Sequence, residues 1–135
     1  FAKCLADEGM DVAGDPAISY TETHQVIVKV GYSKGPEVAE RLERNNIIVN
    51  YQATPEEEGF TASGALRMGV NEMTRFGFGK EEFKRLAHLI AECVKGVDVK
   101  DEVIKFRSGY TEMKYCFSDK ELDGAMENFC KATGL

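Results

Sequence analysis

The sequence has few of the residues on which nucleophilic or metal-assisted enzymes depend. It contains two histidines, His24 and His88, and four cysteines that form no CxxC-type pair, so a zinc site is not expected. No serine or cysteine lies in a nucleophile-elbow context, and no glycine-rich stretch carries the lysine of a phosphate-binding loop. We therefore expect no catalytic residue and no metal ligand in this chain. Both histidines are expected to have structural or surface roles.

Positive charge and long apolar runs are also scarce. The formal net charge of −6 argues against nucleic acid or an anionic membrane as a partner held by bulk electrostatics. No apolar run approaches the ~20 residues of a membrane-spanning helix, and no signal peptide opens the chain. Scattered cysteines are typical of a reducing cytoplasm, where we expect this protein to reside.

The length of 135 residues is sufficient for one domain with its own core. The chain begins with Phe1 in what reads as a helix already under way, so we expect residues 1–135 to be one domain of a longer protein. The β-branched and apolar runs predict three strands. These strands are "HQVIVKV" (24–30), "IIVNY" (47–51) and "GALRMGV" (64–70).

Apolar residues at helical spacing predict helices between and after these strands. Gly9 is placed to end the first helix, and Asn45 with Asn46 the second. The "SDKE" capping box at residues 118–121 predicts a final helix. The helices are expected at 1–9, 36–46, 80–94, 100–109 and from 118 onward.

The final helix is expected to bury one face, formed by Leu122, Met126, Phe129 and Cys130. Helices and strands in this order predict an α+β fold, a two-layer sandwich with helices gathered on one face of a small sheet. Because a hairpin-like loop joins two of the three strands, the sheet is expected to be largely antiparallel.

One arginine does not fit the apolar strand that contains it. Arg67 lies between Leu66 and Met68, with Gly64 and Gly69 close by, in the stretch "TASGALRMGVNEMTRFGFG". A guanidinium offers a planar fork that matches a carboxylate with two parallel hydrogen bonds, and small neighbours allow a ligand close to the backbone. Two interpretations follow from the residue types: a carboxylate-binding site, or a surface arginine in a salt bridge.

The pattern around Arg67 resembles a known family. The motif Ser63-Gly64-x-x-Arg67-x-Gly69, followed by Thr74-Arg75-x-Gly77 and an amphipathic helix, is similar to the carboxyl-terminal domain of serine hydroxymethyltransferase, a fold-type I pyridoxal-phosphate enzyme. "TETHQVIVKV" resembles the Thr-x-x-His strand entry of that family, with His24 as its histidine.

The resemblance implies a role for Arg67: binding the α-carboxylate of the glycine or serine that is joined to the cofactor. It also implies that the Schiff-base lysine and the other cofactor-binding residues belong to an N-terminal large domain, to which nothing in this chain corresponds. The parent protein is expected to be a cytoplasmic homodimer that uses pyridoxal phosphate, whereas the 135 residues alone are expected to be inactive.

The loop after the second predicted strand departs from the family pattern. Many members read Asn-x-Asn there, with the second asparagine contacting folate, whereas this chain has Asn50 and then Gln52. The family resemblance implies tetrahydrofolate as a ligand. Because Gln52 replaces the asparagine, a folate-independent aldolase or lyase of the same fold type is the alternative. A third hypothesis, from another class, is a free-standing regulatory domain in which Arg67 grips an amino-acid effector.

Overall fold

A four-stranded antiparallel sheet forms one layer of the molecule. The computed structural model describes residues 1–54, 62–114 and 119–134. The strands lie in the order β1-β2-β4-β3, and each neighbouring pair is antiparallel. The α+β fold with a small antiparallel sheet is confirmed, although one more strand is present than the three expected. The strands are β1 (Asp11–Val12), β2 (Gln25–Lys29), β3 (Asn50–Gln52) and β4 (Ala65–Gly69).

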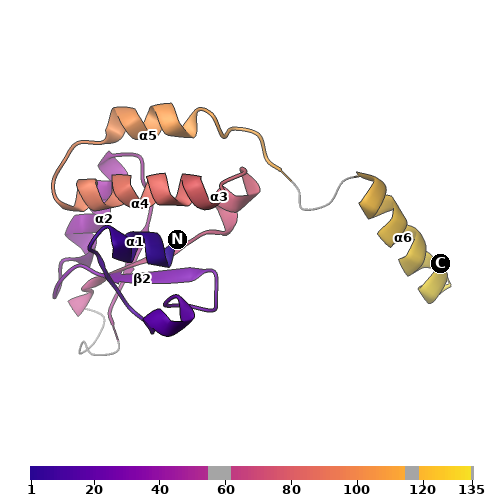
Figure 1. Ribbon diagram of the computed structural model, residues 1–135, viewed down its shortest axis with the longest axis horizontal. Helices are drawn as coiled ribbons and strands as arrows, with labels where there is room; N and C mark the ends of the chain where they lie inside the picture. The colour runs from indigo at the N-terminus through magenta and orange to yellow at the C-terminus, as the bar shows by residue number, and fades with distance from the viewer. Residues whose placement is uncertain (55–61, 115–118, 135) are drawn as a thin grey trace.

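Helices form the second layer. Figure 1 shows α1 and α4 on one side of β2, with α5 over α4 on the side away from the sheet. Within the described ranges, no helix is long and apolar enough to cross a membrane. The helices are α1 (Ala2–Asp7), the 3₁₀ turn η1 (Pro16–Ile18), α2 (Gly35–Arg44), α3 (Asn71–Arg75), α4 (Lys80–Val94), α5 (Lys100–Arg107) and α6 (Asp119–Thr133).

The core lies between the sheet and these helices because β2 and β4 alternate in register. Val26 is opposite Met68 and Val28 is opposite Leu66, so all four side chains lie on one face, which we call the packed face. All four are buried, and they belong to one apolar cluster with residues of α1, α2 and α4. The pairs put alternate residues, including Ile27 and Arg67, on the opposite face, which we call the open face.

The predicted helix stops at Gly9 and Asn46 are confirmed, and they share one mechanism. Both residues adopt positive φ, 84° and 62°, at the position directly after the helix cap. In the second case the Ile47 N–H donates to the Leu42 carbonyl at 2.9 Å, which closes the backbone loop that typically ends a helix. This turn delays the next strand: β3 begins at Asn50, so the strand expected from residue 47 was placed too early.

Two short elements were missed by the sequence patterns. β1 lies between the first predicted helix and the first predicted strand. Its two residues pair with Val28 and Lys29 of β2, and Val12 is buried in the core. α3 has five residues and no side-chain N-cap, and it ends at Gly77, whose φ is 95°. Elements this short depend on contacts with distant segments, which local spacing does not report.

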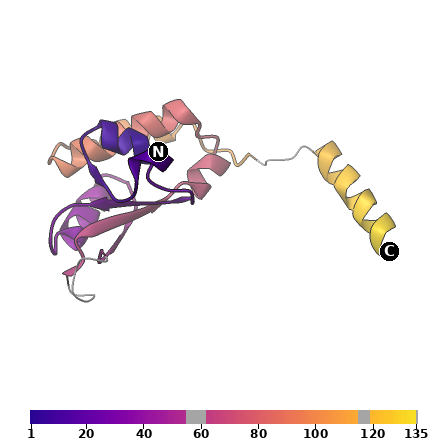
Figure 2. The same ribbon diagram turned by 60° about the horizontal axis from the view of Figure 1, so that its bottom comes forward.

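The expectation that α6 buries one face was wrong. Leu122, Met126 and Phe129 are 54%, 54% and 55% exposed, and Cys130 is half-buried. Figures 1 and 2 both show α6 lying apart from the rest of the molecule. Helical spacing identifies which face is apolar, but it does not establish what covers that face. The predicted cap residue Ser118 lies outside the described residues.

Candidate functional site

Arg67 lies at the centre of the open face. It is on β4, between β2 and β3, directly opposite Ile27 on one side and Asn50 on the other. Its side chain is exposed, and within residues 1–54, 62–114 and 119–134 it has no hydrogen-bond or ion-pair partner. The surface salt bridge that the sequence left open therefore has no support in the described part of the chain.

A cavity of about 820 Å³ adjoins Arg67. Its polar lining includes His24, Asn50 and Glu72, and its apolar lining includes Phe78 and Leu89. The lining therefore combines charged and amide side chains with hydrocarbon. This combination is common in sites for small organic molecules.

Asn50 and Gln52 share the open face with Arg67, because Asn50 pairs with Arg67 and Gln52 pairs with Ala65. The Asn50 side-chain oxygen accepts the Tyr51 N–H at 2.8 Å, which orients the amide. Asn50 lines the cavity, whereas Gln52 lies outside its lining. The two residues predicted for the folate side therefore lie together on β3, the strand next to Arg67. Only Asn50 lines the same cavity as Arg67.

Ser63 and Gly64 anchor the start of β4 through their backbone. The Ser63 carbonyl accepts the Gly35 N–H, and the Gly64 carbonyl accepts the Val30 N–H, each at 2.8 Å. A Cβ added to Gly35 would lie 2.5 Å from the Ser63 oxygen, so α2 starts in direct contact with this segment. Through these backbone hydrogen bonds the two residues fix the start of the strand that carries Arg67.

The remaining motif residues hold the segment that follows β4. The Thr74 hydroxyl donates to the Val70 carbonyl at 2.7 Å, and the Val70 N–H donates to the His24 carbonyl at 3.2 Å. Gly77 ends α3, whereas Gly69 has ordinary φ and room for a Cβ, whose nearest neighbour is 3.6 Å away. The absence of a side chain at Gly69 therefore leaves space on the open face beside Arg67, although packing does not require glycine there.

His88 has a structural role as well. Its Nδ1 lies 3.1 Å from the Glu8 carboxylate, which links α4 to the end of α1.

An aromatic cluster that the sequence analysis did not find contributes Phe78 and Phe106 to the apolar lining of the cavity. Phe78 packs edge-on against Tyr110 with ring centroids 4.8 Å apart, and Phe106 packs against both rings. The Tyr110 hydroxyl donates to the Glu82 carboxylate at 2.8 Å. This hydrogen bond, together with one from the Gly79 N–H, holds the pKa of Glu82 below its usual value.

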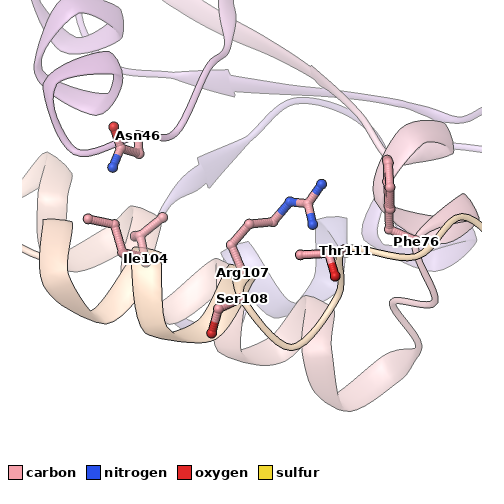
Figure 3. Close-up of a pocket in the computed structure, with 7 residues that line it drawn as sticks. Asn46, Phe76, Ile104, Arg107, Ser108 and Thr111 are labelled. Carbon is pink, nitrogen blue, oxygen red and sulfur yellow. The ribbon is translucent and has the colours of Figure 1, made fainter.

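A second pocket, of about 540 Å³, lies between α3, α5 and the end of α2. Figure 3 shows Asn46 and Ile104 at one end, Phe76 at the other, and Arg107 between them. The Arg107 guanidinium lies 4.4 Å from the centroid of the Phe76 ring and donates to the Tyr110 carbonyl. Asn46, Val103 and Arg107 line both cavities, so the two adjoin at these residues.

Within the described residues, no group of three or more His, Cys, Asp or Glu side chains is gathered to hold a metal ion. No lysine lines either cavity in the same part of the chain. The residues present therefore fit an anionic substrate group at Arg67, but they offer no amine for covalent attachment of pyridoxal phosphate.

The fold is similar to that of a solved pyridoxal-phosphate enzyme. It superimposes on L-threonine transaldolase from Pseudomonas fluorescens with a TM-score of 0.73 and 24% sequence identity, over 93% of this chain and 30% of that chain. The sheet and helices thus share the fold of one part of that enzyme.

Comparison of the sequence with known proteins identifies the family to which this chain is related. No model of a known protein family matches the chain. The chain is 47% identical over 126 residues to serine hydroxymethyltransferase from Pyrobaculum aerophilum, and 37% identical over 131 residues to that from Nitrosopumilus maritimus. The chain is therefore homologous to a segment of serine hydroxymethyltransferases, which confirms the resemblance at residues 63–79. The matches cover 90% and 89% of this chain, which spans 29% of the length of each relative.

Proposed function

We propose that this chain is the C-terminal small domain of a pyridoxal-phosphate enzyme that interconverts serine and glycine. In this proposal Arg67 binds the α-carboxylate of the amino acid. The observation that carries it is an arginine at the centre of the open face, beside a cavity, with no partner among the described residues. Homology to serine hydroxymethyltransferases over most of the chain supports the same substrate class.

The physical reason for an arginine is geometric. Its planar fork forms two parallel hydrogen bonds with a carboxylate and fixes the orientation of the bound amino acid as well as its position. A lysine would supply the charge without the fork. Because β4 is paired on both sides and packed on its other face, the guanidinium projects from a rigid element, which favours precise orientation.

The cofactor is held elsewhere in this proposal. Pyridoxal phosphate, when bound, supplies an electron sink for charge that develops at the α-carbon. The cavities described here contain no lysine in their lining, so we assign cofactor attachment to an N-terminal large domain outside this chain. The full-length enzyme is proposed to be a cytoplasmic homodimer, as the resemblance implies.

Tetrahydrofolate is the proposed one-carbon acceptor. Asn50 lines the Arg67 cavity, and Gln52 lies two residues further along the same strand, β3. Glutamine keeps the amide of the family's asparagine but moves it by one methylene. A folate-independent aldolase remains the second candidate within the same fold, because Gln52 lies outside the cavity lining.

The test uses the full-length protein that carries this segment, loaded with pyridoxal phosphate. We expect Arg67→Ala to lower kcat/KM for serine by roughly 30- to 3,000-fold, the effect of removing about 2–5 kcal/mol of charge-pair binding. Arg67→Lys should recover little of this loss. Arg44→Lys, at an exposed arginine of α2, is the matched control and should leave kcat/KM unchanged. Equal activity of the wild type and Arg67→Ala would refute the assignment.

The regulatory-domain hypothesis is separated by a binding measurement on the 135-residue chain. A domain that supplies half a site should show no saturable glycine binding by titration calorimetry up to millimolar concentrations. Saturable binding that Arg67→Ala abolishes would instead identify a free-standing amino-acid sensor.

A further inference from the structure

Helix α6 carries an apolar stripe that nothing in the described structure covers. Leu122, Met126 and Phe129 recur at helical spacing and lie on one side of the helix, and each is more than half exposed. An isolated helix of 15 residues is only marginally stable in water, so its helicity depends on an apolar surface to pack against.

The second pocket offers such a surface on the same chain. Phe76, Val103 and Ile104 contribute its apolar lining, and Ile104 is 50% exposed (Figure 3). The pocket opens between α3 and α5, and Thr111, just beyond α5, also lines it. The exposed stripe and the exposed pocket are therefore neighbours in sequence.

The covalent connection is short enough to favour contact within one chain. The Lys114 N–H donates to the Arg75 carbonyl at 2.5 Å, which ties this point of the chain to α3 beside the pocket. From Lys114 to Asp119 an extended backbone reaches at most about 18 Å, whereas α6 itself is about 22 Å long. A tether of this length gives an effective concentration of the order of millimolar, which a second copy reaches only in concentrated solution.

The charges of the two surfaces are complementary. Among the described residues that line the second pocket, Arg107 is the only charged one. In the sequence of α6, acidic residues outnumber Lys120 and Lys131, and the exposed Asp123 lies next to the apolar stripe. Docking of α6 therefore brings acidic side chains toward the Arg107 guanidinium while it buries the stripe.

We propose that α6 folds back on its own domain and packs Leu122, Met126 and Phe129 into the pocket lined by Phe76, Val103 and Ile104. In the docked state α6 covers the end of the pocket whose Asn46, Val103 and Arg107 side chains also line the Arg67 cavity. The helix is thereby a strap that shields this end of the site from water, a role independent of which amino acid or one-carbon carrier the site uses.

Hydrogen exchange of the 135-residue chain, followed by mass spectrometry, tests the docking. Amides of α6 should exchange at least tenfold more slowly in the wild type than in Met126→Asp, which places a charge in the stripe. Asn128→Asp, on the polar side of α6, is the matched control and should exchange like the wild type. Equal exchange in the wild type and in Met126→Asp would overturn the proposal.

A reciprocal pair of variants probes the pocket. Ile104→Asp should release α6 and accelerate its exchange as Met126→Asp does, whereas Lys105→Asp, one residue along α5, should not. Since Ile104 is half exposed, the substitution leaves the core intact, and unchanged exchange of α4 amides verifies this. Protection of α6 that is insensitive to Ile104→Asp would place the helix somewhere else and contradict the assignment.

Oxidative cross-linking distinguishes the same chain from a second copy. A variant with Ile104→Cys and Met126→Cys, oxidised at low micromolar concentration, should form a bridge between positions 104 and 126 within a monomer, identified by peptide mass. A bridge between the same positions found only in a covalent dimer would show exchange of α6 between copies and would refute docking within one chain.

Discussion

The two faces of the sheet differ in what surrounds them, although they belong to the same strands. On the packed face, Leu66 and Met68 are buried against the helices and join the apolar core. On the open face, Arg67 lies between them in sequence but is exposed, with Ile27 and Asn50 as its cross-strand neighbours. One strand thus combines a side that packs into the core with a side that we propose binds the substrate. Because these sides alternate along the strand, substitution can test the two roles separately.

The largest effect on stability is expected on the packed face. Leu66→Ala should lower the free energy of unfolding by about 2–5 kcal/mol, because it removes a fully buried side chain and leaves a cavity. Arg67→Ala, one residue away, should change it by no more than about 0.5 kcal/mol. Urea unfolding of the 135-residue chain measures both values. Similar losses in the two variants would show that the faces are not separate in energy.

A smaller loss of stability is expected from breaking the hydrogen bonds of Asn45, which link two helices of the helix layer. The buried Asn45 side chain donates to the Arg41 carbonyl at 3.0 Å and accepts the Val99 N–H at 2.8 Å, which links the end of α2 to the start of α5. Asn45→Ala leaves the Val99 N–H without its partner and should cost about 1–3 kcal/mol.

Asn45→Asp keeps the acceptor for the Val99 N–H and should lose less stability than Asn45→Ala. The same urea titration checks this order, and the reverse order would show that burying a carboxylate beside the Arg41 carbonyl costs more than the retained Val99 hydrogen bond contributes.

A third prediction concerns the backbone turn that positions the cavity rim. Gly77 has a φ of 95°, and a Cβ there would lie 3.1 Å from the Lys114 amine. Gly77→Ala should therefore destabilise the chain by about 1–2 kcal/mol. Gly69→Ala, on the open face with ordinary φ and free space, is the control and should have little effect on thermal unfolding. Equal shifts in Tm would contradict the turn assignment.

The smallest effect is a pH dependence from the aromatic cluster. The Tyr110 hydroxyl lowers the pKa of Glu82 from 4.5 in the folded state, so the bond stabilises the fold above about pH 4.5, and this contribution is lost as the pH falls through the folded pKa. Tyr110→Phe should have a lower Tm than the wild type near neutral pH, and the difference should shrink below pH 4.5. A difference that stays constant down to pH 3 would exclude Glu82 as the cause.

The parts of the structure that the sequence predicted are those set by local patterns. Alternation placed β2 and β4 within one residue at each end, and the stops at Gly9 and Asn46 follow from residues that tolerate positive φ. β1 depends on pairing with a distant strand, so its local sequence does not reveal it.

The same division holds for the site. The sequence singled out Arg67 as a candidate because a charge in an apolar strand breaks a local pattern, and the structure places it on an exposed face. The buried Asn45 bonds to Val99, 54 positions away, and Glu82 bonds to Tyr110, 28 positions away. These bonds form only when α5 and the residues after it pack against α2 and α4. For α6 the sequence predicted the helix correctly but predicted wrongly that its apolar face is buried. Burial of that face depends on a partner surface, which the local sequence does not reveal.

The most direct test of the central claim compares ligands with and without a carboxylate. The full-length enzyme and its Arg67→Ala variant are titrated with glycine and with glycinamide, in which a neutral amide replaces the carboxylate. If Arg67 binds the carboxylate, the wild type should prefer glycine, and the variant should lose about 2–5 kcal/mol of that preference. If Arg67→Ala weakens both ligands equally, Arg67 does not contact the carboxylate, and the assignment of the open face as the substrate side is wrong.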